Sequence, residues 1–234
     1  MELRDALPKE YEERMVSASL DCVDGERGSG DACHAVGEFF AVVKSDYATA
    51  RGYYETNCDE RKHMASCFNL GRLLLAGKGG DVDDGGAARR FRQACDAGSG
   101  PGCHHLGLMA YERGDKRKGR RHLARACDLR DAESCYVIGS NLLKKETTST
   151  DDEGRFGRLL RGERGKPRRD LDKARACLDL ACDEGHAPAC HNLAVLFKHG
   201  DDGVPPDAEK FQHYAKRTND LVQARGAAQG VKVA

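Results

Sequence analysis

The chain has 234 residues, and its 38 basic side chains balance its 38 acidic ones. A net charge of zero provides no long-range field that would favour nucleic acid or a membrane surface. Hydrophobic residues make up 39% of the chain and tryptophan is absent. This is low for a deep globular core and suits a thin structure whose layers cover one another. No apolar run approaches the roughly 18 residues of a membrane-spanning helix, so none is predicted.

Taken in chain order, the apolar residues predict an opening helix over 8–23 and then five helix pairs. In 64–76, for example, Met64, Cys67, Gly71 and Leu74 recur with the period of a one-faced helix. We call the first helix of each pair helix A and the second helix B. The predicted A helices cover 30–43, 64–76, 101–113, 132–145 and 187–199, and the predicted B helices cover 46–59, 86–97, 115–129, 169–184 and 205–225.

Cysteines recur in pairs at the junction between each helix B and the next helix A. The second cysteines Cys33, Cys67 and Cys103 are 34 and 36 residues apart, and such a fixed period indicates a repeat array. Other offsets repeat with them. Four residues before the first cysteine there is a large apolar residue, and four after the second there is a small one. These are Tyr54, Phe91, Leu123 and Leu178, and Gly37, Gly71, Gly107, Gly139 and Ala194.

The spacing of the eleven cysteines excludes two common roles. There is no C-x-x-C pair, which structural zinc sites usually use, and hence no C-x-x-C-H for c-type haem. Disulfides or reduced buried thiols remain, and recurrence in pairs favours disulfides. Cys177 lies five residues before Cys182 on the same predicted helix and is expected to keep its thiol, either as a packing residue or as a reactive group. The predicted disulfides are Cys22–Cys33, Cys58–Cys67, Cys95–Cys103, Cys127–Cys135 and Cys182–Cys190.

Disulfides persist in oxidising compartments, yet residues 1–14 are acid-rich and contain no apolar secretion segment. A chain that begins this way is expected to be oxidised in the mitochondrial intermembrane space. A secreted bacterial protein is the weaker alternative.

The repeat is interrupted once. Cys135 and Cys190 are fifty-five residues apart, and the excess predicts an insert loop at about 145–168. A basic cluster from Arg155 to Arg169 suggests either a solvated loop or a contact with anionic lipid or an acidic partner. Residues 226–234 are predicted to form a flexible tail.

At this point a family resemblance becomes specific. The pattern A-C-D-x-G followed by C-x-x-L-G resembles the Sel1-like repeat family, in its cysteine-paired branch. Matching strings include Asn57–Glu60, Gly77–Gly80, Cys103–Leu108 and Gly200–Gly203. The resemblance implies an all-α fold, a right-handed αα superhelix (solenoid) of about five disulfide-stapled repeats in a single domain, 1–234. It also implies a monomeric intermembrane-space factor that binds protein partners and supports the biogenesis of cytochrome c oxidase.

Relatives of this kind have also been linked to haem and to thiol–disulfide chemistry, and secreted ones to β-lactam binding. His104 matches the relatives best and is the candidate haem ligand, since histidine is a common axial ligand. Five other histidines lie at similar junctions, namely His34, His63, His105, His186 and His191. A non-catalytic scaffold that requires no cofactor and no metal is favoured. A haem-binding thiol–disulfide oxidoreductase and a β-lactam-binding protein are the alternatives. G-x-S-x-G and H-E-x-x-H are both missing, so hydrolase chemistry has no support in the sequence.

Overall fold

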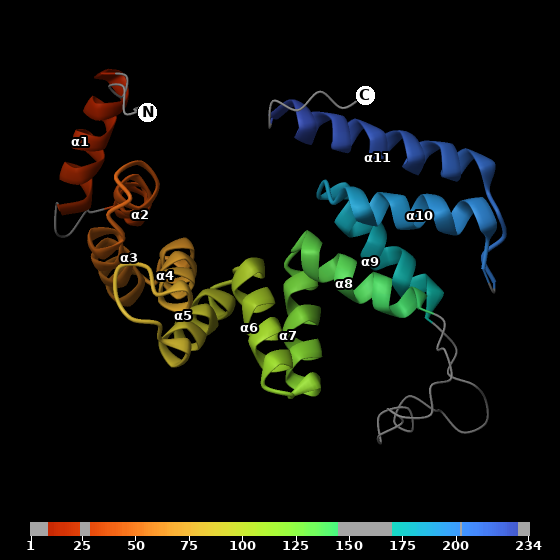
Figure 1. The fold of residues 1–234 in the computed structure, drawn as a ribbon, viewed down its shortest axis with the longest axis horizontal. Helices are drawn as coiled ribbons and strands as arrows, with labels where there is room; N and C mark the ends of the chain where they lie inside the picture. The colour runs from red at the N-terminus through yellow and green to blue at the C-terminus, as the bar shows by residue number, and fades with distance from the viewer. Residues whose placement is uncertain (1–8, 24–28, 145–169, 202, 229–234) are drawn as a thin grey trace. The chain divides into compact units, whose positions relative to one another are not determined.

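A computed structural model describes residues 9–23, 29–144, 170–201 and 203–228. The prediction of an all-α repeat fold is confirmed for these residues (Figure 1). The A-type helices are α2 (Gly30–Glu38, continued by the π-helical turn η1, Phe39–Val43), α4 (Met64–Ala76), α6 (Gly100–Glu112), α8 (Ala132–Leu143) and α10 (Ala187–His199). The B-type helices are α1 (Lys9–Val23), α3 (Tyr47–Arg61), α5 (Asp84–Asp96), α7 (Lys116–Asp128), α9 (Leu171–Asp183) and α11 (Ala208–Ala228).

The chain divides into two compact units, which end and begin at Leu129 and Arg130. Inside each unit, every helix packs on the helix that follows it in the sequence. In the first unit α2 also contacts α4, and in the second α8 contacts α10. The A helices of consecutive repeats are therefore neighbours within a unit.

Aspartates start most of the B helices. Asp46, Asp83, Asp115 and Asp170 each accept a hydrogen bond from the backbone N–H three residues later. Such a cap satisfies a donor that would have no partner in the first turn. Gly98, just after α5, has a φ of 97°, a left-handed conformation in which glycine ends a helix at little cost.

The repeated small and large offsets are close contacts between the two helices of one pair. A Cβ atom added to Gly71 of α4 would lie 2.7 Å from Cε1 of Phe91 on α5. In the second unit, a Cβ on Gly139 of α8 would lie 2.7 Å from Cγ of Leu178 on α9. Phe91 and Leu178 are fully buried. Because the glycine of helix A has no side chain, it leaves a space that the large side chain of helix B fills.

The predicted insert at 145–168, with its basic cluster, lies outside the described residues. Most of the predicted tail lies outside them too, but α11 continues to Ala228, so residues 226–228 are helical. None of the helices in the described ranges has both the length and the apolar character needed to cross a bilayer.

Candidate functional site

Disulfides connect successive helix pairs. Each joins the last turn of a B-type helix to the first turns of the next A helix, with Cα–Cα distances of 4.6 to 4.8 Å that suit the geometry of a bridge. Cys127 and Cys135 are each disulfide-bonded too. The bridges with described geometry are Cys22–Cys33, Cys58–Cys67, Cys95–Cys103 and Cys182–Cys190.

The bridges are inaccessible to an attacking thiol. In three of the four, both cysteines are at most 1% exposed, and Cys22 in the fourth is 8% exposed. Thiol–disulfide exchange requires a thiolate to approach a sulfur atom directly. Buried bridges of this kind stabilise the fold. Cys177 keeps its thiol and is half-buried on α9.

Two of the predicted histidines meet around one serine hydroxyl between α2 and α4. The Nδ1 atoms of His34 and His63 lie 3.0 and 3.1 Å from Oγ of Ser66. The side-chain amide of Asn57 donates to the same oxygen at 2.7 Å. Ser66 and Asn57 are fully buried, so these hydrogen bonds satisfy polar atoms that water does not reach.

Counting donors assigns the tautomers in this network. The backbone N–H of Ser66 donates to Nδ1 of His63 at 3.3 Å, so that nitrogen carries no proton. The opposite Nε2–H of His63 donates to Asp31 at 3.0 Å. The one hydroxyl proton of Ser66 then goes to Nδ1 of His63, and Nδ1–H of His34 donates to the Ser66 oxygen. Burial lowers the pKa of His34 and so favours its neutral form in the folded protein.

A related arrangement recurs in the second unit. His186 has the same place before α10 that His63 has before α4, and its Nε2 atom lies 3.0 Å from Glu133. Its ring packs on Tyr136 with centroids 4.4 Å apart, as His63 packs on His34 at 5.0 Å. Ser66 has no counterpart there, because the equivalent residue is Ala189. The Nδ1 atom of His186 is therefore buried without a hydrogen-bond partner.

One side of the A helices, whose residues are exposed or half-buried, forms the candidate binding surface, which we call the A-helix face. It consists of the residues one and five positions after the second cysteine of each pair. These two positions lie one above the other on a helix, and Glu38 and Arg72 contact His34 and Phe68 in this way. In the first unit the A-helix face comprises His34, Glu38, Phe68, Arg72, His104 and Leu108, and in the second unit Tyr136, Ser140, His191 and Val195.

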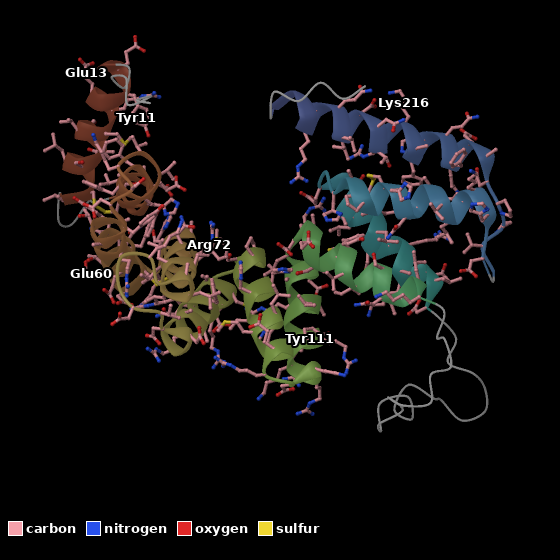
Figure 2. The ribbon with its side chains drawn as sticks, in the orientation of Figure 1. Tyr11, Glu13, Glu60, Arg72, Tyr111 and Lys216 are labelled. Carbon is pink, nitrogen blue, oxygen red and sulfur yellow. A yellow bond between two sulfur atoms is a disulfide. The ribbon has the colours of Figure 1, made fainter. Side chains whose placement is uncertain are left out.

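The chemistry of this face changes from repeat to repeat. At the fifth position the first unit presents an acid, a base and an apolar residue, namely Glu38, Arg72 and Leu108, and all three are exposed. Arg72 is labelled in Figure 2. In the second unit, a shallow hollow of about 300 Å³ is lined by Ser140, Val195 and neighbouring residues. Constant backbone positions that carry variable side chains are suited to selective protein binding.

Comparison with known proteins identifies the repeat. A profile of the Sel1 repeat matches residues 30–56, 65–99, 100–131, 157–186 and 187–216, which is more than half of the chain. The chain belongs to the Sel1 repeat family. Four of these matches contain most or all of an A helix and run into the B helix that follows it, whereas the match at 157–186 contains only α9 among the described residues.

Relatives of known name are similar over most of the chain. Cytochrome c oxidase assembly factor 7A of Xenopus laevis is 31% identical over 201 residues, which cover 82% of this chain and 79% of the relative. Cytochrome c oxidase assembly factor 7 of Xenopus tropicalis is 28% identical over 224 residues, which cover 91% of this chain and 88% of the relative. The human protein of that name is 30% identical over 186 residues, which cover 76% of this chain and 58% of the relative. The expected resemblance is thereby confirmed.

Solved structures support the Sel1 fold independently. A Sel1 repeat protein from Oxalobacter formigenes has a TM-score of 0.62 at 16% identity, covering 90% of this chain and 78% of that one. A protective antigen of uropathogenic Escherichia coli with an SLR fold has a TM-score of 0.63 at 19% identity, covering 92% and 44%. At this level of identity the likeness concerns the fold alone.

The Sel1 framework shows which predicted residues come together. His34 and His63 meet, whereas His104 lies half-buried on the A-helix face beside His105, with ring centroids 5.8 Å apart. Two hollows in the described part of the second unit are lined by other residues and not by His104. Haem binding through His104 stays a prediction. In the described ranges, no three His, Cys, Asp or Glu side chains are grouped so that they could hold a metal ion.

Sequence reasoning missed the fifth positions of the A-helix face and the buried pair Asn57 and Ser66. The fifth positions share no residue type, so recurrence does not reveal them. The spacing of four residues from the histidine or aromatic beside each cysteine was the available signal.

The neutral His34 gives a testable dependence of stability on pH. Burial lowers the pKa of His34 below its ordinary 6.5, and His63 lowers it further, while Glu38 and Asp31 oppose the change. Between the folded and unfolded pKa values, the unfolded state binds more protons. The contribution of His34 to the free energy of unfolding is therefore fully present above about pH 6.5 and is lost as the pH falls through its lowered folded-state pKa.

We expect urea titrations to show a lower free energy of unfolding at acid pH, with a smaller decrease in His34→Gln, because glutamine does not titrate. Histidine NMR signals followed through the same pH range would check the direction of the shift. A pKa of His34 above 6.5 would contradict the assigned network.

Proposed function

We propose that this protein is a cytochrome c oxidase assembly factor that acts as a disulfide-stabilised scaffold for a protein partner. The observation that carries the proposal is the similarity over most of the chain to several proteins named cytochrome c oxidase assembly factor 7. Sel1 repeats, like other helical repeats, provide extended surfaces for protein binding. Together these findings support a role in the assembly of that complex.

The burial of the bridges favours a scaffold over an oxidoreductase. In Cys58–Cys67, Cys95–Cys103 and Cys182–Cys190 neither cysteine is more than 1% exposed, so a substrate thiol would reach these sulfurs only after local unfolding. The A-helix face, in contrast, is accessible in the folded state. We therefore assign partner binding to this face, with the three consecutive helices α2, α4 and α6 of the first unit as its main part.

The proposed location is the mitochondrial intermembrane space. Several buried disulfides require an oxidising compartment for their formation, and the relatives' role concerns a respiratory enzyme. Non-reducing gels combined with protease protection in mitochondria with intact and ruptured outer membranes would test the location. Protection that persists after the outer membrane is ruptured would contradict it.

Changing the A-helix face should impair the assembly function. In cells that lack this protein, we expect the wild-type chain to restore cytochrome c oxidase activity and the assembled complex on native gels. The double variant Arg72→Glu/Leu108→Asp should fail to do so. Central contacts of a binding surface each contribute about 2 kcal/mol or more, so partner affinity should fall at least about 30-fold.

A matched variant separates this effect from a general change of surface. Arg89→Glu/Val222→Asp makes the same chemical changes at exposed positions of B-type helices and should restore activity fully. Crosslinking with mass spectrometry in intact mitochondria would identify the partner and the contact residues. Full rescue by the A-helix variant, with crosslinks elsewhere, would refute the assignment of the face, and normal complex levels without the protein would refute the assembly role.

A further inference from the structure

The helix α7 carries a dense group of positive charges in a protein whose net charge is zero. Between its first residue and Arg125 it presents six exposed cations, and Asp128 is the single acid inside the helix. The cations are Lys116, Arg117, Lys118, Arg120, Arg121 and Arg125. Although the charges of the whole chain balance, positive charge is therefore concentrated on α7.

The direction of these charges follows from how α7 packs. Its buried residues include Gly119 and Leu123, and the ring of Tyr111 on α6 covers Gly119 so closely that a Cβ there would lie 2.6 Å from the ring. At 100° per residue, Arg117 and Arg121 lie on the opposite side of the helix. Figure 2 shows nitrogen-ended side chains around this hairpin, near the labelled Tyr111.

Two arginines of this region are neutralised within the fold. Arg90 of α5 pairs with Asp59 and Glu55 of α3, and Arg125 of α7 pairs with Asp96 of α5.

A second group of arginines has no such neutralisation. Among the residues that the structure describes, no carboxylate forms an ion pair with Arg117 or Arg121, nor with the exposed Arg92 and Arg113. We call these four arginines the α7 basic face.

The arginines also affect the pKa of a neighbouring histidine, His122. The pKa of His122 is lowered, first by partial burial and then by Arg92, Arg121 and Arg125, with Asp96 acting in the opposite direction. Charges from both α5 and α7 therefore act at one place. Arg92 of α5 and Arg121 of α7 are therefore close enough to act on the same side chain.

We propose that the α7 basic face docks an acidic segment of a partner protein, separately from the A-helix face. All four members are arginines, whose planar guanidinium groups bind carboxylates through two hydrogen bonds. Arg117 and Arg121 are one helical turn apart, about 6 Å along the axis, which matches carboxylates one turn apart on an acidic helix.

Two other anionic partners are less suited to this face. The exposed residues of α7 include no large apolar or aromatic side chain that could enter a bilayer. The zero net charge of the whole chain is unlike the basic footprint of a nucleic-acid-binding protein. An acidic protein segment requires neither feature.

Binding of a short fluorescent Glu/Asp-rich peptide to the full, disulfide-intact chain tests the proposal. We expect binding in about 50 mM salt that weakens strongly at about 300 mM, because surface charges are screened. Arg117→Gln/Arg121→Gln should weaken binding about tenfold. Lys173→Gln/Arg225→Gln removes two exposed charges in the second unit and should change it less than about twofold. In NMR titrations, peptide binding should raise the pKa of His122.

Equal affinity of the wild-type chain and Arg117→Gln/Arg121→Gln would overturn the proposal. So would tighter binding to vesicles with anionic lipid or to duplex DNA than to the peptide, or equal binding of the Gln/Asn version of the peptide. Because both substituted arginines are exposed, the variant should keep its helical circular dichroism. Cytochrome c oxidase activity does not enter this test, so its outcome is independent of the proposed assembly function.

Discussion

Replacing Cys95 and Cys103 together by alanine is expected to lower the free energy of unfolding by about 2.5 kcal/mol. The bridge closes a loop between residues eight apart, and the loss of that loop's closure constraint in the unfolded chain accounts for this value in the chain-entropy model. For a chain of this size, the change corresponds to a decrease in Tm of roughly 5–10 °C. Thermal and urea unfolding followed by circular dichroism would measure it.

Cys177→Ala is the matched control for this substitution. Cys177 keeps its thiol and is half-buried, so its replacement should lower stability by less than about 1 kcal/mol. The double variant should keep its helical spectrum in the cold, because the helix pairs still pack. Equal melting temperatures of the double variant and the wild-type chain would show that this bridge does not stabilise the fold.

Gly71→Ala should destabilise the protein, although alanine is the better helix former. The added Cβ would lie 2.7 and 2.8 Å from two ring carbons of Phe91, which is fully buried and has no room to move. Overpacking of a core typically lowers stability by about 1–3 kcal/mol. This exceeds the gain of roughly 0.5–1 kcal/mol that alanine otherwise brings to a helix. The net loss should be about 1–2 kcal/mol by urea titration.

Gly52→Ala should have the opposite sign. Gly52 lies inside α3 and is exposed, and a Cβ there would meet nothing within 4 Å. The helix-propensity gain should then raise stability by about 0.5–1 kcal/mol. If both glycine variants were stabilised, the close contact between Gly71 and Phe91 would be wrong.

The repeat architecture could be predicted because its signals are local and recurrent. The bounds of α4 and α10 agree with the predicted ranges, 64–76 and 187–199, since apolar period, N-caps and left-handed glycines act within a few residues. The contact between Gly71 and Phe91 also had a signal in the sequence. The same contact occurs in successive helix pairs, so the small and the large residue recur at fixed distances from the cysteines.

The histidines show where local signals end. The sequence placed His34 beside Cys33 and His63 four residues before Cys67, but nothing local indicated that both would share the hydroxyl of Ser66. His104 has the same offset as His34, yet it contacts His105. Side chains in equivalent positions thus differ in partner, because Ser66 comes to His34 from the neighbouring repeat whereas His105 is the next residue of the helix that carries His104.

The sequence by itself determined the helix pairs, their period and the positions of the cysteines, because these depend on residues close together in the chain. Only the tertiary structure decided which side chains are exposed. It buried the bridge sulfurs, placed Glu38, Arg72 and Leu108 on the A-helix face, and left Arg117 and Arg121 without a carboxylate among the described residues. Burial and charge compensation depend on what the next repeat places against each helix, and that information is distributed over residues far apart in the sequence.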